Sequence, residues 1–407
     1  MKQHWIATSL ASATLLAAPT SARAGELFLL GLVPYSYAEQ PSADGRVVVG
    51  YDGQGAWYWT RETWVVRLDQ SLPPGNGVGG RPNITADGRF ITCSTLQGTP
   101  PKTEATIFDR ELGEYDPAVG SLGYNCDIER SGPWGMTPSG SHVCGLVWDS
   151  GCNAYGFVWD AASDTMRLLP SLYFYKPTRA NGVSDDGSFV GGWNDDYTGF
   201  RQGCVWKKNA KGNYVATLLN TGVATVKLRE VSCVSGNGQW AYGAGRAGID
   251  GGVPYRWSYA TGYQPIVGGV GTVYRANYDG SILLMGSGVW IAGRGYIPLR
   301  NWAAEHGFTL TTDWNFQPFG MTDDALTITG YAIRTSDLAW SPFVLDLRPT
   351  AQPCPADLDG NREVGAPDLA LLLGAWDSFG GAADLNGDGA VGAPDLAVLL
   401  SAWGACP

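Results

Sequence analysis

The sequence predicts an all-β fold, a seven-bladed β-propeller, followed by a small C-terminal α-helical calcium-binding domain. Three observations predict this arrangement. The 407 residues include 57 Gly and 24 Pro, which leave little room for helices in the body of the chain. A turn-and-strand unit recurs seven times in that body, and an acidic twelve-residue loop followed by an apolar run occurs twice near the C-terminus.

The first 24 residues have the features of a secretory signal peptide. Lys2 precedes an apolar run from Trp5 to Ala18, and Ala22-Arg23-Ala24 has the spacing of a cleavage site. We therefore expect residues 1–24 to be removed and the protein to be secreted, extracellular or at the cell surface. No later stretch approaches 18 uninterrupted apolar residues, so the sequence predicts no membrane span.

Residues 25–349 form the repeat array. Each copy has a short turn, usually Asp-Gly, then a β-rich run, and later a second run centred on Trp or another large apolar residue. The turns and first runs occupy residues 42–50, 85–93, 137–145, 184–192, 235–243, 277–286 and 322–330. The second runs occupy residues 56–60, 105–109, 156–160, 203–207, 254–258, 288–292 and 342–346.

The spacing between these turns, 42 to 52 residues, is close to the length of a four-stranded propeller blade. One repeat cannot bury its apolar face alone, whereas a closed ring removes the open ends and the exposed strand edges. A seven-bladed propeller is the leading architecture, and a two-domain β-sandwich is the competing one. The pattern S-x-D-G-x-x-V-x-G followed by F/W-x-W resembles the HAF-type repeat of secreted bacterial proteins, most closely at 42–50 and 184–192.

Residues 354–407, separated from the array by a linker at 350–353, contain two calcium-loop motifs 27 residues apart, at 357–368 and 384–395. Calcium prefers six to eight oxygen ligands, and such a loop supplies them from positions 1, 3, 5, 7, 9 and 12. The predicted ligands, with main-chain oxygens at Glu363 and Ala390, are Asp357, Asp359, Asn361, Glu363, Asp368, Asp384, Asn386, Asp388, Ala390 and Asp395. We expect two Ca²⁺ ions, the first bound more weakly because Arg362 occupies position 6, where Gly389 stands in the second loop.

An apolar helix is predicted after each loop, over 369–376 and 396–403, and no amphipathic helix precedes either loop. Together with the repeated GAPDLAxLLxAW, this arrangement resembles the type I dockerin domain. The resemblance implies calcium binding and docking onto a cohesin module. It places the partner-binding surface at Ala366, Pro367, Leu369, Ala393, Pro394 and Leu396, repeated in both halves so that docking could occur in two orientations. Pro367 and Pro394 also suit the first turn of a helix.

Eight cysteines in an exported chain favour disulfides over zinc ligands. Cys354 and Cys406 bracket the calcium module and are predicted to pair. Cys144 and Cys152 flank a short turn and could pair across a hairpin. The partners of Cys93, Cys126, Cys204 and Cys233 are left open by the sequence.

The formal net charge is −11, and no stripe of Lys and Arg occurs, which argues against nucleic acid and anionic membranes as partners. No nucleophile elbow, zinc-binding HExxH or phosphate-binding loop is present. Asp195, Asp196 and Glu230 are candidate acids, but nothing ranks them. The Trp residues of the second runs are expected in the core. Loop aromatics are the better ligand candidates, namely Tyr173, Phe174, Tyr175, Trp193 and Tyr197.

Three functions remain open. The first is a secreted, non-catalytic protein whose propeller binds a glycan or protein ligand and whose dockerin-like module docks onto a cohesin-type or other surface partner. The second is a propeller polysaccharide hydrolase or lyase that acts in polysaccharide catabolism and is attached to a scaffold by the same module. The third is a structural surface protein with a calcium-stabilised C-terminal cap.

Overall fold

The computed structural model of the protein divides into two compact units, residues 25–348 and the unit that contains the C-terminal residues from 349 onward. The structure describes residues 25–73, 80–122, 130–222, 228–244, 253–348, 354–359, 361 and 363–405. The expected signal peptide and linker therefore lie outside the described residues.

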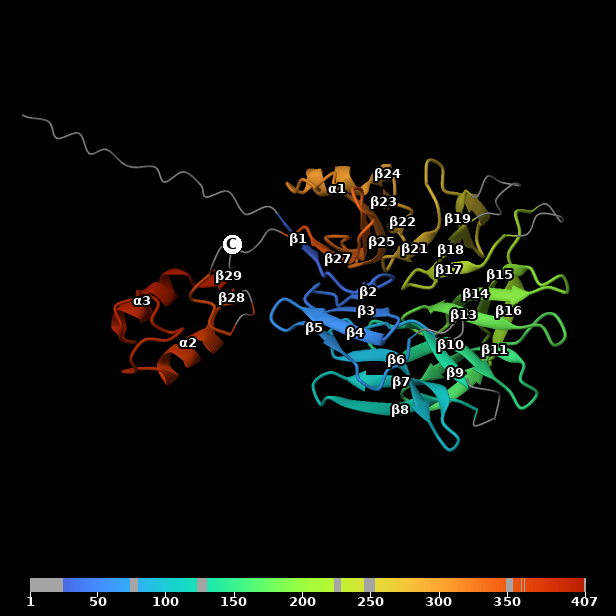
Figure 1. Ribbon diagram of the computed structural model, residues 1–407, viewed down its shortest axis with the longest axis horizontal. Coiled ribbons are helices and arrows are strands. Elements are labelled where there is room, and N and C mark those ends of the chain that lie inside the picture. The colour runs from blue at the N-terminus through green and yellow to red at the C-terminus, as the bar shows by residue number, and fades with distance from the viewer. Residues whose placement is uncertain are drawn as a thin grey trace, which may run out of the picture. The chain divides into compact units, whose positions relative to one another are not determined.

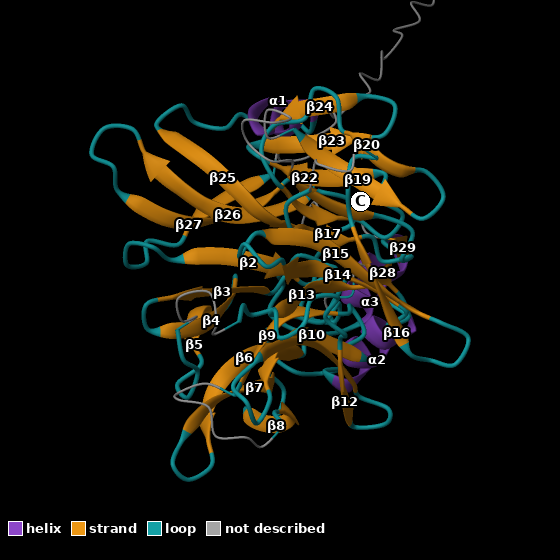
Figure 2. Cartoon of the chain, turned by 90° about the vertical axis from the view of Figure 1, so that its right-hand side faces the viewer, coloured by secondary structure: helices purple, strands orange, loops and turns teal. Residues whose placement is uncertain are grey.

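Residues 25–348 form a seven-bladed β-propeller, which confirms the predicted architecture. Six blades contain four antiparallel strands each, and the blades follow one another around the ring in chain order (Figure 1). The second blade contains three strands, and at its innermost position an isolated bridge joins Ile84 to Ile91. Strands dominate this unit, as Figure 2 shows.

The strands of the first four blades are β2 (Tyr37–Pro41), β3 (Val48–Asp52), β4 (Gly55–Thr60), β5 (Trp64–Arg67); β6 (Phe90–Gln97), β7 (Lys102–Asp109), β8 (Glu114–Gly120); β9 (Ser131–Met136), β10 (His142–Trp148), β11 (Ala154–Asp160), β12 (Thr165–Leu168); β13 (Thr178–Val183), β14 (Phe189–Asp195), β15 (Arg201–Lys208) and β16 (Tyr214–Leu218). Those of the last three are β17 (Val231–Val234), β18 (Ala241–Ala244), β19 (Pro254–Ser258), β20 (Gly262–Pro265); β21 (Val273–Ala276), β22 (Ile282–Met285), β23 (Gly288–Ile291), β24 (Gly295–Pro298); and β25 (Trp314–Met321), β26 (Thr327–Arg334) and β27 (Trp340–Asp346), completed by β1 (Glu26–Leu29).

Every repeated turn joins the innermost segment of a blade to its next strand, and every second run lies in the third strand. The turn is held by its own side chains. The Ser42 hydroxyl donates to Asp44 Oδ1 over 2.6 Å and accepts the N–H of Val47 over 3.1 Å. Asp44 Oδ1 also accepts the N–H of Arg46 over 3.0 Å, and Gly45 takes a left-handed φ of 70°. The same bonds recur in the turns that begin at Thr85, Ser184, Ser235 and Thr322.

Neighbouring turns are joined to one another by backbone hydrogen bonds. Ala43 N–H donates to the Ala86 carbonyl over 2.9 Å, and Ala86 N–H donates to the Pro138 carbonyl over 2.7 Å. Between the seventh and first turns the link is a side chain. The Arg348 guanidinium donates to the Asp44 carbonyl over 2.8 Å and lies 3.4 Å from Asp324 Oδ2.

The ring is closed by the two ends of the unit. Strand β1 pairs antiparallel with β27, from Glu26 opposite Asp346 to Leu29 opposite Phe343. The seventh blade thus takes its outermost strand from the N-terminus and its other three from the C-terminal end. We call this pairing of β1 with β27 the seam. The ring cannot open there unless all the hydrogen bonds between the two strands break.

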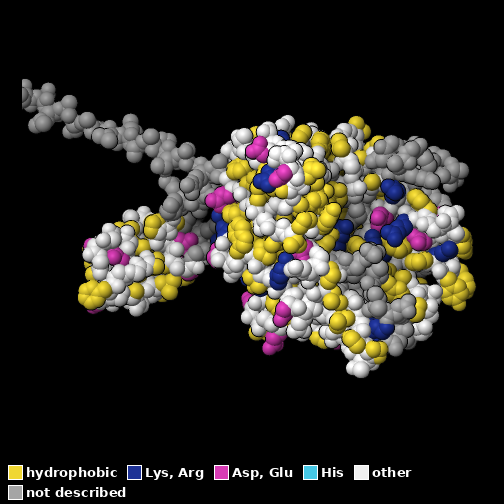
Figure 3. Space-filling view, in the orientation of Figure 1, with side chains coloured by type: hydrophobic (Ala, Val, Ile, Leu, Met, Phe, Trp, Pro, Cys, Tyr) yellow, Lys and Arg dark blue, Asp and Glu magenta, His cyan; other side chains and the backbone are white. Residues whose placement is uncertain are grey.

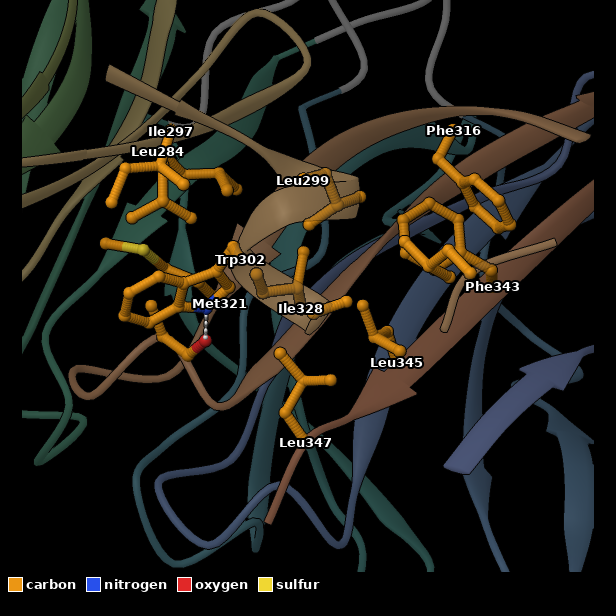
Figure 4. Packing of buried hydrophobic residues seen from close by; sticks show 14 of the residues in the cluster. Leu284, Ile297, Leu299, Trp302, Phe316, Met321, Ile328, Phe343, Leu345 and Leu347 are labelled. Atoms are coloured by element: carbon orange, nitrogen blue, oxygen red, sulfur yellow. Dashed lines mark hydrogen bonds between the residues drawn. The ribbon is translucent and has the colours of Figure 1, made fainter. Parts of the chain in front are cut away.

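Apolar clusters between adjacent blades form the core. The largest lies between the sixth and seventh blades and includes Leu284, Phe316 and Phe343 (Figure 4). A helix, α1 (Leu299–Glu305), inserts Trp302 into this cluster, where its Nε1 donates to the Ala325 carbonyl over 2.8 Å. The Gly- and Pro-rich composition did not predict this helix. It follows β24, and the described residues of the other connections between blades contain no helix.

Most Trp residues of the second runs are core residues, as expected for a propeller, although Trp290 is only partly buried. Trp59, Trp159, Trp206 and Trp257 are all buried, whereas Trp148, at the end of β10, is only partly buried. Their indole rings fill the space between one blade and the next.

The cysteines of the propeller correct the disulfide prediction. Cys144 is a buried free thiol, so it does not pair with Cys152. The reason is register: Cys144 lies in the middle of β10 opposite Val158, far from the turn after Trp148 that contains Cys152. Cys152 is disulfide-bonded elsewhere. The remaining free thiols, each buried in a different blade, are Cys93, Cys204 and Cys233.

The C-terminal unit contains two nine-residue helices, α2 (Ala366–Gly374) and α3 (Ala393–Ser401). They begin three residues before the predicted bounds, because Gly365 and Gly392 act as N-caps and a proline follows in the first turn. A short ladder, β28 (Glu363–Val364) with β29 (Gly404–Ala405), joins the beginning of the first helix to the end of the unit. No helix among the described residues has the length and apolarity that a membrane crossing requires.

The two halves of the unit enclose one small core. It consists of Ala356, Val364, Leu372, Ala383, Val391 and Leu399. Cys354 is disulfide-bonded, but its predicted partner, Cys406, lies outside the described residues.

Gly45 lies close to side chains at the end of the propeller sequence, so its substitution should lower the unfolding free energy more than substitution of an uncrowded glycine. Gly45 and Gly113 both have φ of 70°. A Cβ on Gly45 would overlap Thr327 and Arg348, whereas a Cβ on Gly113 would meet nothing within 4 Å. Gly113→Ala should cost about 1 kcal/mol of unfolding free energy from backbone strain alone. Gly45→Ala should cost clearly more in chemical denaturation, and equal losses would contradict this effect of crowding.

Burial of the free cysteines predicts their reactivity. Burial raises the pKa of Cys93, Cys144 and Cys233 to about 12, and it raises the pKa of Cys204 as well. Because the thiolate is the reactive form, native protein should show no fast reaction with Ellman's reagent. Denatured, unreduced protein should show four thiols. Rapid labelling of the native protein would contradict the buried placement.

Candidate functional site

A channel runs through the propeller, and the innermost segments of all seven blades line it. The cavity toward the N-terminal ends of these segments has a volume of about 240 Å³ and is called the upper channel. A second cavity of about 130 Å³, at the repeated turns, is called the lower channel. Both are lined by residues of every blade.

A recurrent β-bulge aims side chains into the upper channel. In six blades the ladder between the innermost and second strands slips by one residue, always at the position three residues before the turn begins. A bulge leaves one residue unpaired and turns its side chain away from the regular alternation. The residues at this position are Glu39, Trp134, Asn181, Ser232, Tyr274 and Phe319, and all of them line the upper channel.

The last Gly of the repeat allows this close approach. In β14, a Cβ on Gly192 would overlap the carbonyl oxygen of Arg179 on the innermost strand. Gly243 stands in the same relation to the Glu230 carbonyl. The Gly of V-x-G therefore keeps the innermost strand pressed against its neighbour and holds Arg179 and Glu230 at the channel wall.

The charged side chains of the upper channel are three arginines and two glutamates. Glu39 is only 1 % exposed and lies between Arg81, at 3.6 Å, and Arg275, at 3.7 Å. Both distances exceed those of a hydrogen bond. Arg179 pairs more closely with Glu230, at 3.0 Å. Burial lowers the pKa of Arg179 to about 10, although Glu230 opposes this effect.

Arginine and tryptophan side chains alternate from the channel outward. The Arg179 guanidinium lies 3.7 Å from the centre of the Trp134 ring, and Arg81 approaches the same ring at 5.5 Å. Trp193 is approached by Arg179 at 5.3 Å and by Arg201 at 4.8 Å. These cation–π contacts join the second, third and fourth blades and fix the guanidiniums in place. In Figure 3, Lys and Arg side chains gather on the right-hand part of the propeller, interspersed with a few Asp and Glu side chains.

Aromatic rings occupy the opposite side of the upper channel, on the sixth, seventh and first blades. Tyr274 and Phe319 line the cavity with ring centres 4.9 Å apart. Phe319 contacts Tyr37 and Tyr331, and Tyr331 stacks on Trp340 with ring centres 4.0 Å apart. The upper channel therefore has a guanidinium wall and an aromatic wall.

The lower channel has the opposite charge. Asp185 and Asp323, both in the repeated turns, line it. Burial raises the pKa of Asp185, and the nearby carboxylates Asp323 and Asp186 raise it further. Burial also raises the pKa of Asp323. The channel is therefore cationic at one end and acidic at the other.

The predicted propeller candidates are only partly brought together. Glu230 lines the upper channel. Asp195 lies at the end of β14; burial raises its pKa, and its Oδ1 has no hydrogen-bond partner among the described residues. Asp196 is a turn residue that accepts the N–H groups of Thr198 and Phe200.

The predicted loop aromatics likewise divide into exposed and buried side chains. Phe174, Tyr175 and Tyr197 are 74 %, 64 % and 68 % exposed, and Tyr173 packs edge-on against Tyr197 at 5.2 Å. Trp193, in contrast, is buried in the arginine–tryptophan stack. The sequence analysis missed Arg81, Arg275, Tyr274 and Phe319. Tyr274 and Phe319 could have been found from their position three residues before a repeated turn, and Arg81 and Arg275 lie one residue to either side of that position.

The first C-terminal loop gathers its carboxylates. Oxygens of Asp357, Asp359 and Asp368 all lie within 4.8 Å of one another. Asp357 Oδ1 and Asp359 Oδ1 each accept the N–H of Asn361 over 3.0 Å, which curls the loop around these side chains. Asp368 Oδ2 accepts the N–H of Gly365 over 2.8 Å and so caps α2. Burial opposes ionisation of Asp368, but hydrogen bonds from the backbone outweigh it and lower its pKa.

The second loop repeats this arrangement. Asp384 Oδ1 accepts the N–H groups of Gly387 and Asp388, and its Oδ2 accepts the N–H of Gly389. Asp395 Oδ2 caps α3 by accepting the N–H of Gly392 over 2.7 Å. Backbone hydrogen bonds, that of Gly392 first, lower the pKa of Asp395. Arg362, the expected cause of weaker binding in the first loop, lies outside the described residues.

The expected docking residues divide by exposure. Ala366, Pro367, Ala393 and Pro394 are exposed, whereas Leu369 and Leu396 are partly buried against the core of the unit. Two further pairs of exposed apolar side chains, each pair 27 residues apart, follow toward the C-terminal end of each helix. They are Leu373 (51 %) with Leu400 (52 %), and Trp376 (37 %) with Trp403 (50 %).

No protein-family model and no curated protein matches the chain. Among solved structures, an oligogalacturonate lyase from Vibrio parahaemolyticus is 13 % identical, with a TM-score of 0.50 over 79 % of this chain and 93 % of that one. The β-propeller domain of the Trilobed protease from Pyrococcus furiosus is 11 % identical, with a TM-score of 0.45 over 77 % and 96 %. A putative TolB from Agrobacterium tumefaciens is 12 % identical, with a TM-score of 0.40 over 60 % and 87 %. The likeness to the Vibrio structure, at 13 % identity, is one of fold alone.

Proposed function

We propose that this protein is an exported, calcium-binding adaptor. In this proposal the dockerin-like C-terminal unit docks onto a cohesin-type or other surface protein, and the propeller is a non-catalytic domain that binds a ligand in its upper channel. The observation that carries the proposal is the convergence of Asp357, Asp359 and Asp368 in the first loop, in a sequence pattern that the second loop repeats.

The residues present fit Ca²⁺, a hard cation that takes oxygen ligands. Asp357, Asp359, Asn361 and the Glu363 carbonyl would supply the first ion, and Asp384, Asn386, Asp388 and the Ala390 carbonyl the second. Asp368 and Asp395 would contribute through Oδ2, which accepts one backbone N–H and keeps a lone pair. Bound Ca²⁺ would neutralise each acidic loop and so join it to the start of its helix.

The repeated exposed side chains support docking. Leu373 with Trp376, and Leu400 with Trp403, give the two halves the same apolar surface beside the expected residues Ala366, Pro367, Ala393 and Pro394. Large aromatic side chains that become buried on binding often dominate the affinity of an interface. An equivalent pair in each half would allow a partner to bind in two orientations.

A catalytic propeller, a polysaccharide hydrolase or lyase attached through the same unit, is the competing function. The raised pKa of Asp195, caused by burial, is the observation that favours it, because an acid catalyst must hold its proton near neutral pH. The Vibrio protein is described as an oligogalacturonate lyase, but the likeness to it covers the fold alone. Release of new reducing or unsaturated ends by the intact protein, lost in Asp195→Asn, would favour the catalytic function.

Calcium titration of the full mature chain tests the loops. We expect two binding events by calorimetry and a higher unfolding temperature of the C-terminal unit, because a ligand that binds only the folded state stabilises it. Asp384→Asn should remove one event, and Arg362→Gly should strengthen the weaker one. Asp377→Asn removes the same charge outside both loops and should leave two events. A chain that binds no Ca²⁺ would contradict the proposal.

Docking can be measured against a panel of immobilised cohesin modules with calcium present. Trp376→Ser or Trp403→Ser alone should retain most of the binding, because the other half can still dock. The double variant should bind at least 100-fold more weakly. Phe379→Ser serves as a control, because Phe379 is 93 % exposed but has no aromatic counterpart 27 residues later. Unchanged binding by the double variant would exclude this surface, leaving the calcium module a structural cap.

A further inference from the structure

The guanidiniums of Arg81 and Arg275 have donors to spare. Their shared counter-ion, Glu39, is 3.6 Å from one and 3.7 Å from the other, and its Oε1 has no hydrogen-bond partner among the described residues. Nε of Arg275 is also buried without a partner there. Unmet donors in a cavity are costly, and an anion with two oxygens would accept hydrogen bonds from the guanidiniums.

Arg179, which lines the same cavity, also has other arginines close to it. Arg179 is only 7 % exposed, and its pKa is lowered first by burial and then by the charges of Arg201 and Arg81. Glu230 compensates for part of this repulsion. A bound anion between these guanidiniums would relieve the rest, because opposite charge favours the ionised form of arginine.

The cationic lining continues out of the channel. A groove of about 440 Å³ between the fourth and fifth blades is lined by Arg201 and Arg229, and it shares Glu230, Ser232 and Thr272 with the upper channel. Arginines therefore succeed one another from the channel centre to the propeller surface. Such a series suits a ligand that carries an anionic group on each of several successive units.

The aromatic wall restricts the chemistry of those units. Tyr274 and Phe319 face the cavity across from Arg81 and Arg179, with Arg275 next to Tyr274 on β21, and both rings are partly exposed within the cavity. Apolar ring faces stack against the C–H face of a sugar, whereas Arg presents a planar fork that matches a carboxylate. A pyranose with a carboxylate at its edge meets both walls at once.

We propose that the upper channel and the adjoining groove bind a carboxylated oligosaccharide, a chain of uronic acid units, an inference that rests on the ligand-binding role proposed above for the propeller. The terminal unit occupies the upper channel between Arg275 and Phe319. The following units lie along the groove, with their carboxylates at Arg201 and Arg229. Nucleic acid fits less well, because the chain has a net charge of −11 and its sequence contains no stripe of Lys and Arg.

The test is calorimetric titration of the full chain with tetramers of galacturonate, mannuronate and glucuronate. EDTA is present throughout, so that calcium cannot bridge a carboxylate to the C-terminal loops. At least one tetramer should bind. Its methyl ester, which keeps the ring but loses the charge, should bind at least 10-fold more weakly, and added NaCl should weaken the acid form only.

Arginine variants locate the site. Arg275→Gln and Arg201→Gln should each weaken binding of the tetramer about 10- to 100-fold, as expected for loss of a charge-assisted hydrogen bond. Arg334→Gln makes the same change on β26 outside the cavities and should bind like the wild type. Unfolding temperatures of all variants show whether each still folds. Because Arg201 is exposed, its substitution tests the proposal even if Arg275→Gln unfolds the ring.

The possible results distinguish failure of the uronate assignment from failure of the proposed adaptor function. Equal binding of acid and ester, both weakened by Phe319→Ala, would overturn the uronate assignment and keep a ligand-binding channel. Tighter binding of a sulfated tetrasaccharide or a single-stranded oligonucleotide would also overturn it. If no oligosaccharide bound, the assignment would fail, whereas the calcium-binding adaptor would still be tested independently by its two metal events.

Discussion

Pairing of β1 with β27 closes the ring, and the rest of the propeller depends on this closure. Each blade buries one face on the blade before it and the other on the blade after it, so an open seam would leave two apolar surfaces in water. Arg348 reinforces the seam by joining the seventh turn to the first, where the other turns described above are joined through the backbone. Only a closed ring brings seven innermost segments around one channel.

Ring closure and the repeated bulge also explain which residue types line the upper channel. The repeated bulge leaves one side chain per blade directed at the channel axis, and the repeat imposes no residue type at that position. The six bulge residues accordingly differ, from Glu39 and Trp134 to Phe319, whereas the turns beside them are nearly identical. The repeat thus separates a constant scaffold from a variable lining. Arg81 and Arg179 come from the second and fourth blades, whereas the rings of the aromatic wall come from the sixth, seventh and first blades, where Arg275 stands beside Tyr274 on β21.

The C-terminal unit follows a different principle. Its core is small, and the carboxylates that cap α2 and α3 are also the residues at position 12 of the calcium loops. If the proposed calcium sites are occupied, Asp368 and Asp395 would couple metal binding to helix capping, and loss of a metal would affect the first turn of a helix. The same duplication repeats the exposed Trp376 at Trp403, which ties the proposed docking surface to the proposed metal sites.

The repeat count, the seven turns and the core Trp residues could be predicted from sequence, because they depend on local hydrogen bonds and on a periodic apolar pattern. Asp44, for example, holds its turn through bonds to residues two positions away on either side. The disulfide expected between Cys144 and Cys152 was wrong, because strand register places Cys144 opposite Val158. Helix α1 was missed, because its formation depends on the pocket that Trp302 fills between two blades.

By itself, the sequence determined the fold class, the order of the blades and the two acidic loops, because each depends on a pattern of residues that are close together in the chain. Only the tertiary structure decided that Arg81, Arg179 and Arg275 share one cavity with Phe319 and Tyr274. Those residues are separated by up to 238 positions in the chain. They meet because closing of the ring brings the innermost segments to one axis, where a bulge directs Tyr274 and Phe319, and neither effect is visible in any single repeat.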